Sequence, residues 1–474
     1  MAPPPKQPSY LIIGAGVFGV STAYHLITQH PDASVTLVDR DAFDAPSRVA
    51  ASWDWNKVVR ADYDDLAYCR LALEAQDVFR SDPLWRPFFH QTGVYWICRS
   101  AYARDVIDNY RRLGRKADLE AVPIAQARRL YGGLFDAADY SGAREVLVNR
   151  SSGWAAAGDC LVAVTRRAIE LGVRYVTADV ATLRLDGEGG RCSGVQTGGG
   201  EVLTADRVVL CTGAFTAKLL EISAASSGID GLRAGPRIVA GAIATGMARL
   251  PDRDFGRFAD MPVGMQGYTA GMGSKSHHIP PHTQIHYHVP CPMYMYKADQ
   301  DQITGPFLGS LPPTPDREIK WWGRTIFRNT HPVLPGRSIS APPEAPDYAQ
   351  WAVPPRLQED VGQARRSFYG TRGDAWPMVK HRICWDAFTT SGDFIVSAHP
   401  AAAGLYVATC GSFHGFKFFP VIGRYVAQML AGDLEPELAG RWAWDRERPD
   451  PALNPEWPRA EMRDMLDPVV EARL

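Results

Sequence analysis

The chain begins with two short apolar runs on either side of a helical segment. Residues 10–14 (YLIIG) and 34–39 (SVTLVD) have the length and composition of buried strands. Between them, residues 19–30 show the apolar pattern of a helix. A strand, a helix and a second strand in this order predict a βαβ unit with two parallel strands.

Similar patterns return twice further along the chain. A helix is predicted over 161–171, and an apolar run over 207–213 predicts a buried strand that ends in glycine. Alternating apolar and polar residues predict shorter strands over 174–178, 180–185, 192–197 and 201–204. Buried strands are expected again at 394–396 and 405–409, followed by a helix over about 416–430.

The segment from 231 to 380 has a different character, because proline and aromatic residues become dense. Strands are predicted at 286–288 and 292–296, and the prolines of 341–355 predict a loop. We therefore expect a nucleotide-binding domain made of discontinuous segments, with a sheet-rich domain inserted between them.

The overall composition is that of a soluble globular protein large enough for two domains. The 474 residues are 46% hydrophobic and 22% charged, with a formal net charge of -1. This balance favours neither nucleic acid nor an anionic membrane surface as a partner. Residues 11–27 are apolar but contain three glycines, and no stretch reaches the roughly 18 apolar residues of a membrane span.

The eight cysteines are scattered without C-x-x-C pairs. This spacing predicts neither a disulfide framework nor a metal site, and it is typical of a protein in a reducing compartment.

The first helix starts with the pattern Gly14-Ala-Gly16-Val17-Phe18-Gly19, and Asp39 lies 20 residues further on. In a dinucleotide site the first glycine allows a tight turn, the second lets the backbone approach a pyrophosphate, and the third packs helix on strand. The acidic residue accepts a hydrogen bond from a ribose hydroxyl. The glycines alone are a weak signal, but with both strands and the acid they predict a bound dinucleotide. This unit does not distinguish FAD from NAD, and Arg40 is compatible with NADP.

Four further motifs narrow the choice of dinucleotide. They are ASWDWNKVVR at 51–60, CTGAFT at 211–216, RICWDAFTTSGDFI at 382–395 and GSFHGFKF at 411–418. Together with the N-terminal fingerprint, in this order, they resemble the sarcosine-oxidase family, and in particular its fungal branch of amadoriases and saccharopine oxidase. The resemblance extends from about residue 9 to 445.

The resemblance implies an α/β Rossmann-type FAD-binding domain of the glutathione-reductase-like type. This domain is interleaved with an α+β substrate domain built on an antiparallel sheet. We expect the FAD-binding domain at 9–90, 151–230 and 385–440, the substrate domain at 91–150 and 231–384, and a C-terminal tail at 441–474.

The resemblance also implies a covalent cofactor, FAD bonded through its 8α-methyl to the sulfur of Cys384. A cysteine buried in a strand is the plainer alternative for that residue. Val180 would meet the adenine end through its backbone, and the 411–417 segment would face the pyrimidine of the flavin. The residues implied in cofactor binding are Gly14, Gly16, Val17, Phe18, Gly19, Asp39, Arg40, Ser52, Asn56, Lys57, Val180, Gly213, Cys384, Phe413, Gly415, Phe416 and Lys417.

Four cationic residues are implied in catalysis. Arg60 and Lys417 match two cations that hold a substrate carboxylate, Lys320 resembles a lysine that activates oxygen, and Lys57 is a further candidate. The alternatives are a surface ion pair of Arg60 with Asp62 or Asp64, a solvated helix face for Lys417, and an edge strand for Lys320. The match of Lys320 requires residues 299–315 to be an insertion; without it the position would fall near Gly305, and the lysine would be missing.

Two departures from the amadoriase pattern concern the substrate. Arg324 stands where amadoriases carry an acidic residue, and Trp442-Ala-Trp444-Asp445 replaces a Trp-Arg-Trp-Arg run. These changes favour an N-methyl, N-alkyl or cyclic amino acid over a fructosyl amino acid. Tyr294, Tyr296, Trp321 and Trp322 are expected either to form an aromatic pocket or to pack in the core.

The expected reaction oxidises the C–N bond of such an amino acid to an imine with release of hydrogen peroxide, in a monomer that needs no metal. Fructosyl amino acid oxidation, a dehydrogenase that passes electrons to an acceptor other than oxygen, and a silent flavoprotein are the alternatives. The residues Ala472-Arg-Leu474 match a peroxisomal signal, which predicts a peroxisomal location and otherwise a cytoplasmic one.

Overall fold

The βαβ unit predicted at the start of the chain forms the centre of a six-stranded sheet. The structure is a computed structural model that describes residues 8–46, 48–186, 190–258, 260–268, 305–343, 350–454 and 456–466. In it β1 (Tyr10–Ile13) and β2 (Val35–Asp39) are parallel neighbours joined by α1 (Val17–Gln29). The helix begins two residues earlier than predicted, directly after Gly16.

Segments from the whole chain complete this first sheet, whose order is β21-β22-β13-β1-β2-β9. The additional strands are β9 (Arg174–Thr177), β13 (Arg207–Leu210), β21 (Ile395–Ala398) and β22 (Leu405–Thr409). Only the pairing of β21 with β22 is antiparallel. The predicted strands at 174–178, 207–213, 394–396 and 405–409 are therefore confirmed, with ends that differ by a few residues.

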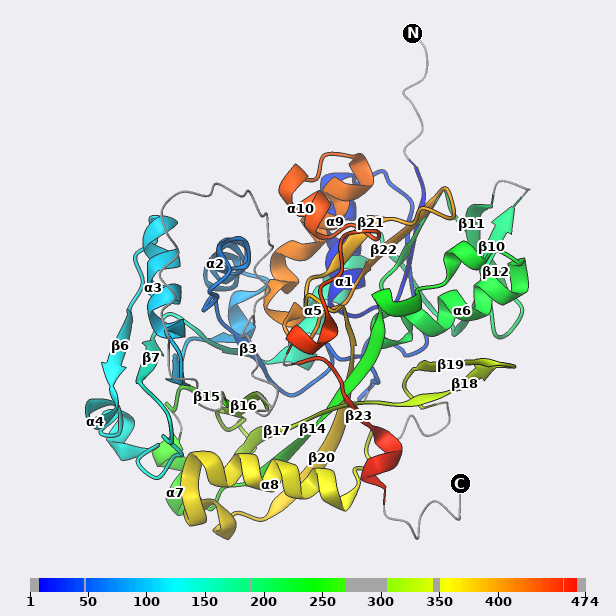
Figure 1. Cartoon of the computed structure of the whole chain (residues 1–474). Helices are drawn as coiled ribbons and strands as arrows, with labels where there is room; N and C mark the ends of the chain where they lie inside the picture. Colours follow the sequence, from blue (N-terminus) through cyan, green and yellow to red (C-terminus); the bar gives the residue numbers. More distant parts are fainter. Residues whose placement is uncertain are drawn as a thin grey trace, which may run out of the picture.

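Helices cover one face of this sheet (Figure 1), and the other face packs against apolar side chains that include Leu183, Val195 and Leu220. Helix α1 packs against α5 (Ala157–Glu170) and α9 (Phe419–Ala431). The backbones of α1 and α9 approach so closely that a β-carbon on Gly423 would lie 2.0 Å from the carbonyl oxygen of Ser21. The predicted helix at 416–430 is instead a 3-10 turn, η7 (Gly415–Phe418), followed by α9.

The second large sheet is mostly antiparallel and contains the strands of the predicted substrate domain. Its order is β20-β14-β17-β16-β15-β5-β7-β6, with β23 paired to β17. The strands are β5 (Val94–Cys98), β6 (Leu119–Pro123), β7 (Glu145–Asn149), β14 (Val239–Arg249), β15 (Val263–Tyr268), β16 (Gly305–Leu311), β17 (Glu318–Arg328), β20 (Met378–Phe388) and β23 (Ala460–Glu461). Helix α8 (Pro355–Tyr369) covers one face of this sheet, as seen in Figure 1.

Three small sheets lie beside the two large ones. They are β10 (Val180–Asp186) with β11 (Arg191–Thr197) and β12 (Val202–Thr204), β3 (Lys57–Val59) with β8 (Gly153–Ala155) and β4 (Phe89–His90), and β18 (Thr330–Leu334) with β19 (Arg337–Ser340). The remaining helices are α2 (Leu66–Ser81), α3 (Tyr102–Arg112), α4 (Ile124–Ala127), α6 (Thr216–Ser227), α7 (Asp252–Phe258) and α10 (Pro436–Arg441).

Several expectations need correction or fall elsewhere. Residues 305–311 form a strand paired with β15 and β17, so the predicted insertion at 299–315 contains part of the sheet. The predicted loop at 341–355 ends where α8 begins at Pro355. The strands predicted at 286–288 and 292–296, with Tyr294 and Tyr296, and the tripeptide Ala472–Leu474 lie outside the described residues.

Within the described ranges, no helix has both the length and the apolar content needed to cross a bilayer. The cysteines in these ranges are all buried and form no disulfide. The same ranges contain no group of three or more His, Cys, Asp or Glu side chains arranged to hold a metal ion.

Candidate functional site

A long cavity runs from the βαβ unit to the second large sheet, and every predicted site residue except Gly19 lines it. The lining includes Gly14, Gly16, Val17, Phe18, Asp39, Arg40, Ser52, Asn56, Lys57, Arg60, Val180, Gly213, Lys320, Cys384, Phe413, Gly415, Phe416 and Lys417. Residues that are 400 positions apart in the sequence, such as Val17 and Lys417, thus line one space.

The three glycines have the separate functions expected of a dinucleotide fingerprint. Gly14 has a φ of 98°, and a β-carbon there would lie 2.5 Å from the carbonyl oxygen of Cys211. A β-carbon on Gly19 would lie 1.9 Å from the carbonyl oxygen of Gly14, so this residue allows close helix packing and does not line the cavity. A β-carbon on Gly16 would face the cavity wall, 3.0 Å from the hydroxyl of Ser52.

The Asp39 carboxylate stabilises one end of the cavity through its contacts with the backbone and with an arginine. Asp39 accepts a 2.6 Å hydrogen bond from the backbone N–H of Ala15 and forms a 3.0 Å ion pair with Arg48. Arg48 was not predicted, although its guanidinium is fully buried. Arg40 forms a 3.5 Å ion pair with Asp179 and lies 4.0 Å from the ring of Phe215, and these contacts orient it along the wall.

Cys384 lies on β20, the strand at the β14 end of the second large sheet, where a lysine approaches its sulfur. The Lys57 ammonium donates a 3.7 Å hydrogen bond to Cys384 Sγ. Two residues earlier on β20, the buried Arg382 donates to the carbonyl oxygens of Arg48, Ala50 and Trp53. Strand β20 therefore presents the cysteine and also fixes the loop that carries Ser52.

Asp54 is the centre of a buried cluster of cations. Its carboxylate lies 2.6 Å from the Lys320 ammonium, 2.9 Å from the Lys57 ammonium and 3.9 Å from the Arg382 guanidinium. Burial opposes ionisation of Asp54, but the three cations together hold its pKa below the usual value. Burial lowers the pKa of Lys320 to about 8, a change that Asp54 limits.

Lys320 lies on an inner strand, since β17 is between β14 and β16. It is only 2% exposed and donates a 3.2 Å hydrogen bond to the carbonyl oxygen of Asn56. The edge-strand alternative is therefore wrong for this residue. Because side chains alternate along a strand, Trp322 also lines the cavity while Trp321 packs in the core against Trp376.

The two cations predicted to hold a carboxylate lie close to each other in the cavity. Arg60 is 4% exposed and donates to the carbonyl oxygen of Asp62 and the hydroxyl of Tyr102, with its guanidinium 4.6 Å from the Trp96 ring centroid. It is thus buried, and the predicted alternative of a surface ion pair is wrong.

Lys417 is 5% exposed and donates a 3.0 Å hydrogen bond to the carbonyl oxygen of His414, so its predicted alternative of a solvated helix face is also wrong. Burial and the neighbouring Arg60 charge lower the pKa of Lys417 well below its ordinary value. An anion bound beside the two cations would oppose both effects and favour the charged form of the lysine.

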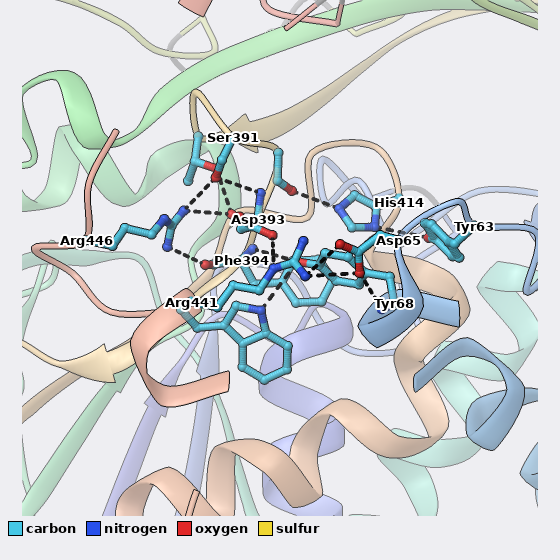
Figure 2. Close-up of polar contacts among 12 residues, drawn as sticks. Tyr63, Asp65, Tyr68, Ser391, Asp393, Phe394, His414, Arg441 and Arg446 are labelled. Atoms are coloured by element: carbon cyan, nitrogen blue, oxygen red, sulfur yellow. Dashed lines mark hydrogen bonds and ion pairs between the residues drawn. The ribbon is translucent and has the colours of Figure 1, made fainter. Parts of the chain in front are cut away.

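The loop that carries Lys417 is supported from behind by a polar network, which Figure 2 shows. His414 contacts the Tyr63 hydroxyl at 3.1 Å and the carbonyl oxygen of Gly392 at 2.9 Å. Deeper in the network, Arg441 donates to the carboxylates of Asp65 and Asp393. The network joins α2, the loop before β21 and the end of α10 to the cavity wall.

The turn before Lys417 is strained and is held by a carboxylate. Cys410, Ser412 and Phe413 all have positive φ values, of 68°, 44° and 60°. Asp386 on β20 accepts a 2.9 Å hydrogen bond from the backbone N–H of Phe413, and burial raises its pKa to about 6. Residues in this backbone region persist only where their surroundings require it, which is common at functional sites.

The two departures used to argue about the substrate do not line the cavity. Arg324 lies on β17 between the cavity-lining residues Trp322 and Ile326 but is itself outside the lining, and it contacts Asp360 and Gln363. The Trp442 side chain is fully buried beside Tyr68, and Trp444 packs on His399. The predicted link between these positions and the substrate is therefore not a direct one.

Sequence reasoning missed two acidic residues of the site, Asp54 and Glu456. Asp54 is part of the 51–60 motif and stands three residues before Lys57, so an acidic residue near this lysine was visible in the sequence. Glu456 lines the cavity from the segment predicted to be a tail, and no local pattern identifies it. Burial raises the pKa of Glu456 to about 7, although Arg60 and Lys417 act to lower it.

The residues present fit an FAD molecule in this cavity. The glycine turn leaves room for a pyrophosphate at the start of α1, and Val180 and Asp39 lie at the end expected for the adenosine. The side-chain oxygen of Asn56 is buried in the cavity wall and has no hydrogen-bond partner among the described residues. A bound flavin ring with its own N–H donor would satisfy such an atom.

Comparisons with known proteins agree with this reading of the cavity. The family model described as "FAD dependent oxidoreductase" matches residues 9–245. L-saccharopine oxidase of Schizosaccharomyces pombe is 26% identical over 465 residues, which cover 94% of this chain and 95% of that protein. Amino acid oxidase imqH of Aspergillus flavus is 26% identical and covers 90% of this chain and 93% of its own.

A solved structure shows the same fold. Fructosyl peptide oxidase from E. terrenum superposes with a TM-score of 0.76 and covers 98% of this chain and 99% of its own, at 21% sequence identity. This likeness confirms the predicted fold class.

Replacing Asp54 by Asn tests whether its charge stabilises the cation cluster. Removing one partner of a buried ion pair typically costs about 3–5 kcal/mol, and we expect a loss of this size in the free energy of unfolding at pH 7. The pKa of Asp54 in the folded protein lies below the ordinary pKa of an aspartate. This stabilisation is therefore complete at pH values above the ordinary pKa and is lost as the pH falls through the folded-state pKa. Urea unfolding measures it, with Asp433→Asn as an exposed control. A loss below about 1 kcal/mol would show that the cluster does not depend on this anion.

Proposed function

Because the chain belongs to the DAO family of FAD-dependent oxidoreductases, we propose that it oxidises the C–N bond of an N-substituted amino acid, with oxygen as the electron acceptor. The observation that carries this proposal is the pair of buried cations, Arg60 and Lys417, in the wall of the FAD cavity. Burying two cations together is unfavourable unless an anion joins them. The carboxylate of an amino acid is such an anion.

The cations would also orient the substrate. Each charge-assisted hydrogen bond to the carboxylate contributes about 1.5–3 kcal/mol and has a preferred geometry. Arg60 is fixed by Asp62, Tyr102 and Trp96, and Lys417 by His414, so the carboxylate would be held between two groups with little freedom of their own. A fixed carboxylate places the adjacent C–H bond in one position, which is the main contribution that a protein can make to such a reaction.

FAD, when bound, supplies the chemistry of accepting two electrons and a hydrogen from the substrate carbon and passing them to oxygen. The products would be an imine, which water can hydrolyse, and hydrogen peroxide. The relatives support an amino-acid-derived substrate, since their names are L-saccharopine oxidase and amino acid oxidase. The N-methyl, N-alkyl or cyclic nature of the substrate amine is part of the proposal.

We also propose that the flavin is bonded to Cys384. The thiol lies in the cavity wall, within hydrogen-bonding distance of the Lys57 ammonium.

Lys320 is proposed to act on oxygen. Its ammonium lies in the same cavity on the side of β17, and Asp54 supports its charged form in spite of burial. A buried positive charge stabilises the negative charge that develops on oxygen as it is reduced.

Covalent attachment predicts that acid-precipitated protein stays yellow and has gained the mass of FAD. Cys384→Ala should release its flavin into the supernatant, because only the sulfur can form the bond. Absorbance and intact mass of the pellet measure this outcome. Cys192→Ala, which removes a buried thiol remote from the cavity, is the matched control. Flavin in the supernatant of the unmodified protein would refute the linkage.

Replacing Lys320 by Met should slow the reaction of reduced enzyme with oxygen far more than reduction by substrate. Loss of a buried charge of this kind reduces a rate by about two to three orders of magnitude. Stopped-flow absorbance separates the two half-reactions, and Lys218→Met is a control for removing a lysine elsewhere. If the reduction of the flavin and its reoxidation by oxygen are slowed equally, Lys320 has only a structural role.

A double-mutant cycle tests the carboxylate site and with it the class of substrate. Lys417→Ala should lose substrate binding and flavin reduction together, since the same contact sets affinity and orientation. With unmodified enzyme, the amide of the same substrate should lose a comparable amount, whereas the variant should hardly distinguish amide from acid. Simple addition of the two losses would mean that Lys417 does not touch the carboxylate.

The substrate itself is found by measuring peroxide release from a panel of N-methyl, cyclic and fructosyl amino acids. Oxidation of the first two groups supports the proposal. Activity confined to fructosyl amino acids would replace it with a deglycating function, and reduction of the flavin without peroxide would indicate another electron acceptor.

A further inference from the structure

Glu456 is an acidic side chain at the cationic end of the cavity, and the reaction as described gives it no part. It lines the same cavity as Arg60 and Lys417 and is 9% exposed. Its charge interacts with both cations, since each acts to lower its pKa. The three groups therefore form a site with two positive charges and one negative charge.

The segment that carries Glu456 is anchored at both of its sides. Asn454 accepts a 2.9 Å hydrogen bond through its side chain from the backbone N–H of Glu456, and its carbonyl accepts from Trp457 at 3.1 Å. Four residues further on, β23 pairs in parallel with β17, with Ala460 opposite Phe327. Trp457 packs against the apolar cluster that contains Cys384. These contacts fix the position of the Glu456 carboxylate.

An amino acid in water is a zwitterion, with an anionic carboxylate and a cationic amine separated by one carbon. A site that holds the carboxylate on two cations and offers a carboxylate nearby is complementary to both ends of this molecule. The amine must then lose a proton before oxidation, because the nitrogen lone pair forms the C=N bond. A buried carboxylate close to the amine is the group that can take that proton.

We propose that Glu456 binds the ammonium group of the substrate and accepts its proton. The N–H bond of the ammonium breaks and an O–H bond forms on the Glu456 carboxylate, so charge is conserved and no oxidant is consumed in this step. The neutral amine keeps the lone pair that forms the C=N bond when the adjacent hydrogen leaves with two electrons for FAD. This inference rests on the proposed function and adds a catalytic residue and a subsite to it.

The other ionisable groups near these cations have partners of their own. The Asp62 carboxylate, whose charge also acts on Arg60 and Lys417, accepts hydrogen bonds from Asn149 and Ser152 and is outside the cavity lining. Burial and Lys417 lower the pKa of His414 well below its ordinary value, so it stays neutral. Asp386 is engaged by two backbone N–H groups. Lys57 and Lys320 are paired with Asp54, and the hydroxyl of Tyr63 contacts His414, with its pKa raised by burial. Glu456, whose pKa burial raises to about 7, is poised to change protonation near neutral pH.

Binding of two inert ligands tests the ammonium subsite without any turnover. Trimethylglycine and 3,3-dimethylbutanoate share one shape and one carboxylate, but only the first has a positive charge. By calorimetry, the holoenzyme should bind trimethylglycine at least about tenfold more tightly, because its quaternary ammonium is attracted by the Glu456 charge, an attraction of a few kcal/mol for a pair of charges near a protein surface. Glu456→Gln should remove this preference, and Lys417→Ala should weaken both ligands alike.

The pH profile of flavin reduction at saturating substrate tests proton transfer. In unmodified enzyme the rate should rise with pH to a plateau, with its midpoint near pH 7, as the Glu456 carboxyl ionises. In Glu456→Gln the deficit should be about 100-fold at pH 7 and below about tenfold near pH 10, where the amine loses its proton to water. Glu456→Asp, which keeps a carboxyl group, should again show a rate that rises with pH on the acidic side, although the plateau rate should be lower than in unmodified enzyme. The titration of Lys320 affects both proteins equally, so it does not change the ratio of their rates.

A control variant and the results that would overturn each proposal complete the experiment. Glu447→Gln, which makes the same change at an exposed position, should behave as unmodified enzyme. Equal affinity for the two inert ligands, or a deficit in Glu456→Gln that does not change with pH, would overturn the inference while leaving amino acid oxidation intact. Absence of flavin reduction by any amino acid in the unmodified enzyme would instead overturn the proposed function.

Discussion

The cavity depends on one buried anion, the carboxylate of Asp54. It lies between Lys57 and Lys320 and within 3.9 Å of Arg382, so it balances cations from the small sheet that contains β3 and from the second large sheet. Lys57 begins a short strand beside the nucleotide-binding unit, whereas Lys320 and Arg382 are on β17 and β20 of the second sheet. Without this anion, three positive charges would face one another in a region of low dielectric. The cluster therefore joins the two halves of the protein at the point where they enclose the cavity.

The same arrangement explains how a lysine can remain useful in a buried position. Burial alone favours a neutral Lys320, and Asp54 moves its pKa back toward the ordinary value without reaching it. The ammonium keeps a close partner and still faces the cavity wall. At the other end, Glu456 is a carboxylate that lines the cavity with Arg60 and Lys417, and this balance is looser because burial raises the pKa of Glu456. The cluster around Asp54, with its close ion pairs, supports the structure. The charges of Arg60, Lys417 and Glu456 are less completely paired, and this allows a charged ligand to bind among them.

The local features of the sequence predicted the nucleotide-binding unit well. The apolar runs of β1 and β2 and the glycines between them are determined by near neighbours, because a buried parallel strand must be apolar and a tight turn must be glycine. Positions that depend on distant contacts were harder to predict. Strand β16 was assigned to an insertion, since only its pairing with β15 and β17 makes it a strand. Trp442 and Trp444 looked like substrate contacts and are core residues, because sequence position does not show which way a side chain points.

Glu456 shows the limit of sequence reasoning most clearly, and the reason is topological. Strand β16 pairs with β17 only as far as Trp322, which leaves the same edge of β17 open around Phe327. An open edge carries unpaired N–H and C=O groups, and the chain satisfies them by returning β23 to Phe327 and Arg328, where Glu461 also contacts the Arg328 side chain. This pairing brings Glu456 into the cavity wall and Trp457 against the apolar cluster that contains Cys384. The position of an acidic residue in the site thus follows from how a sheet edge is covered, a property that no local pattern around residue 456 contains.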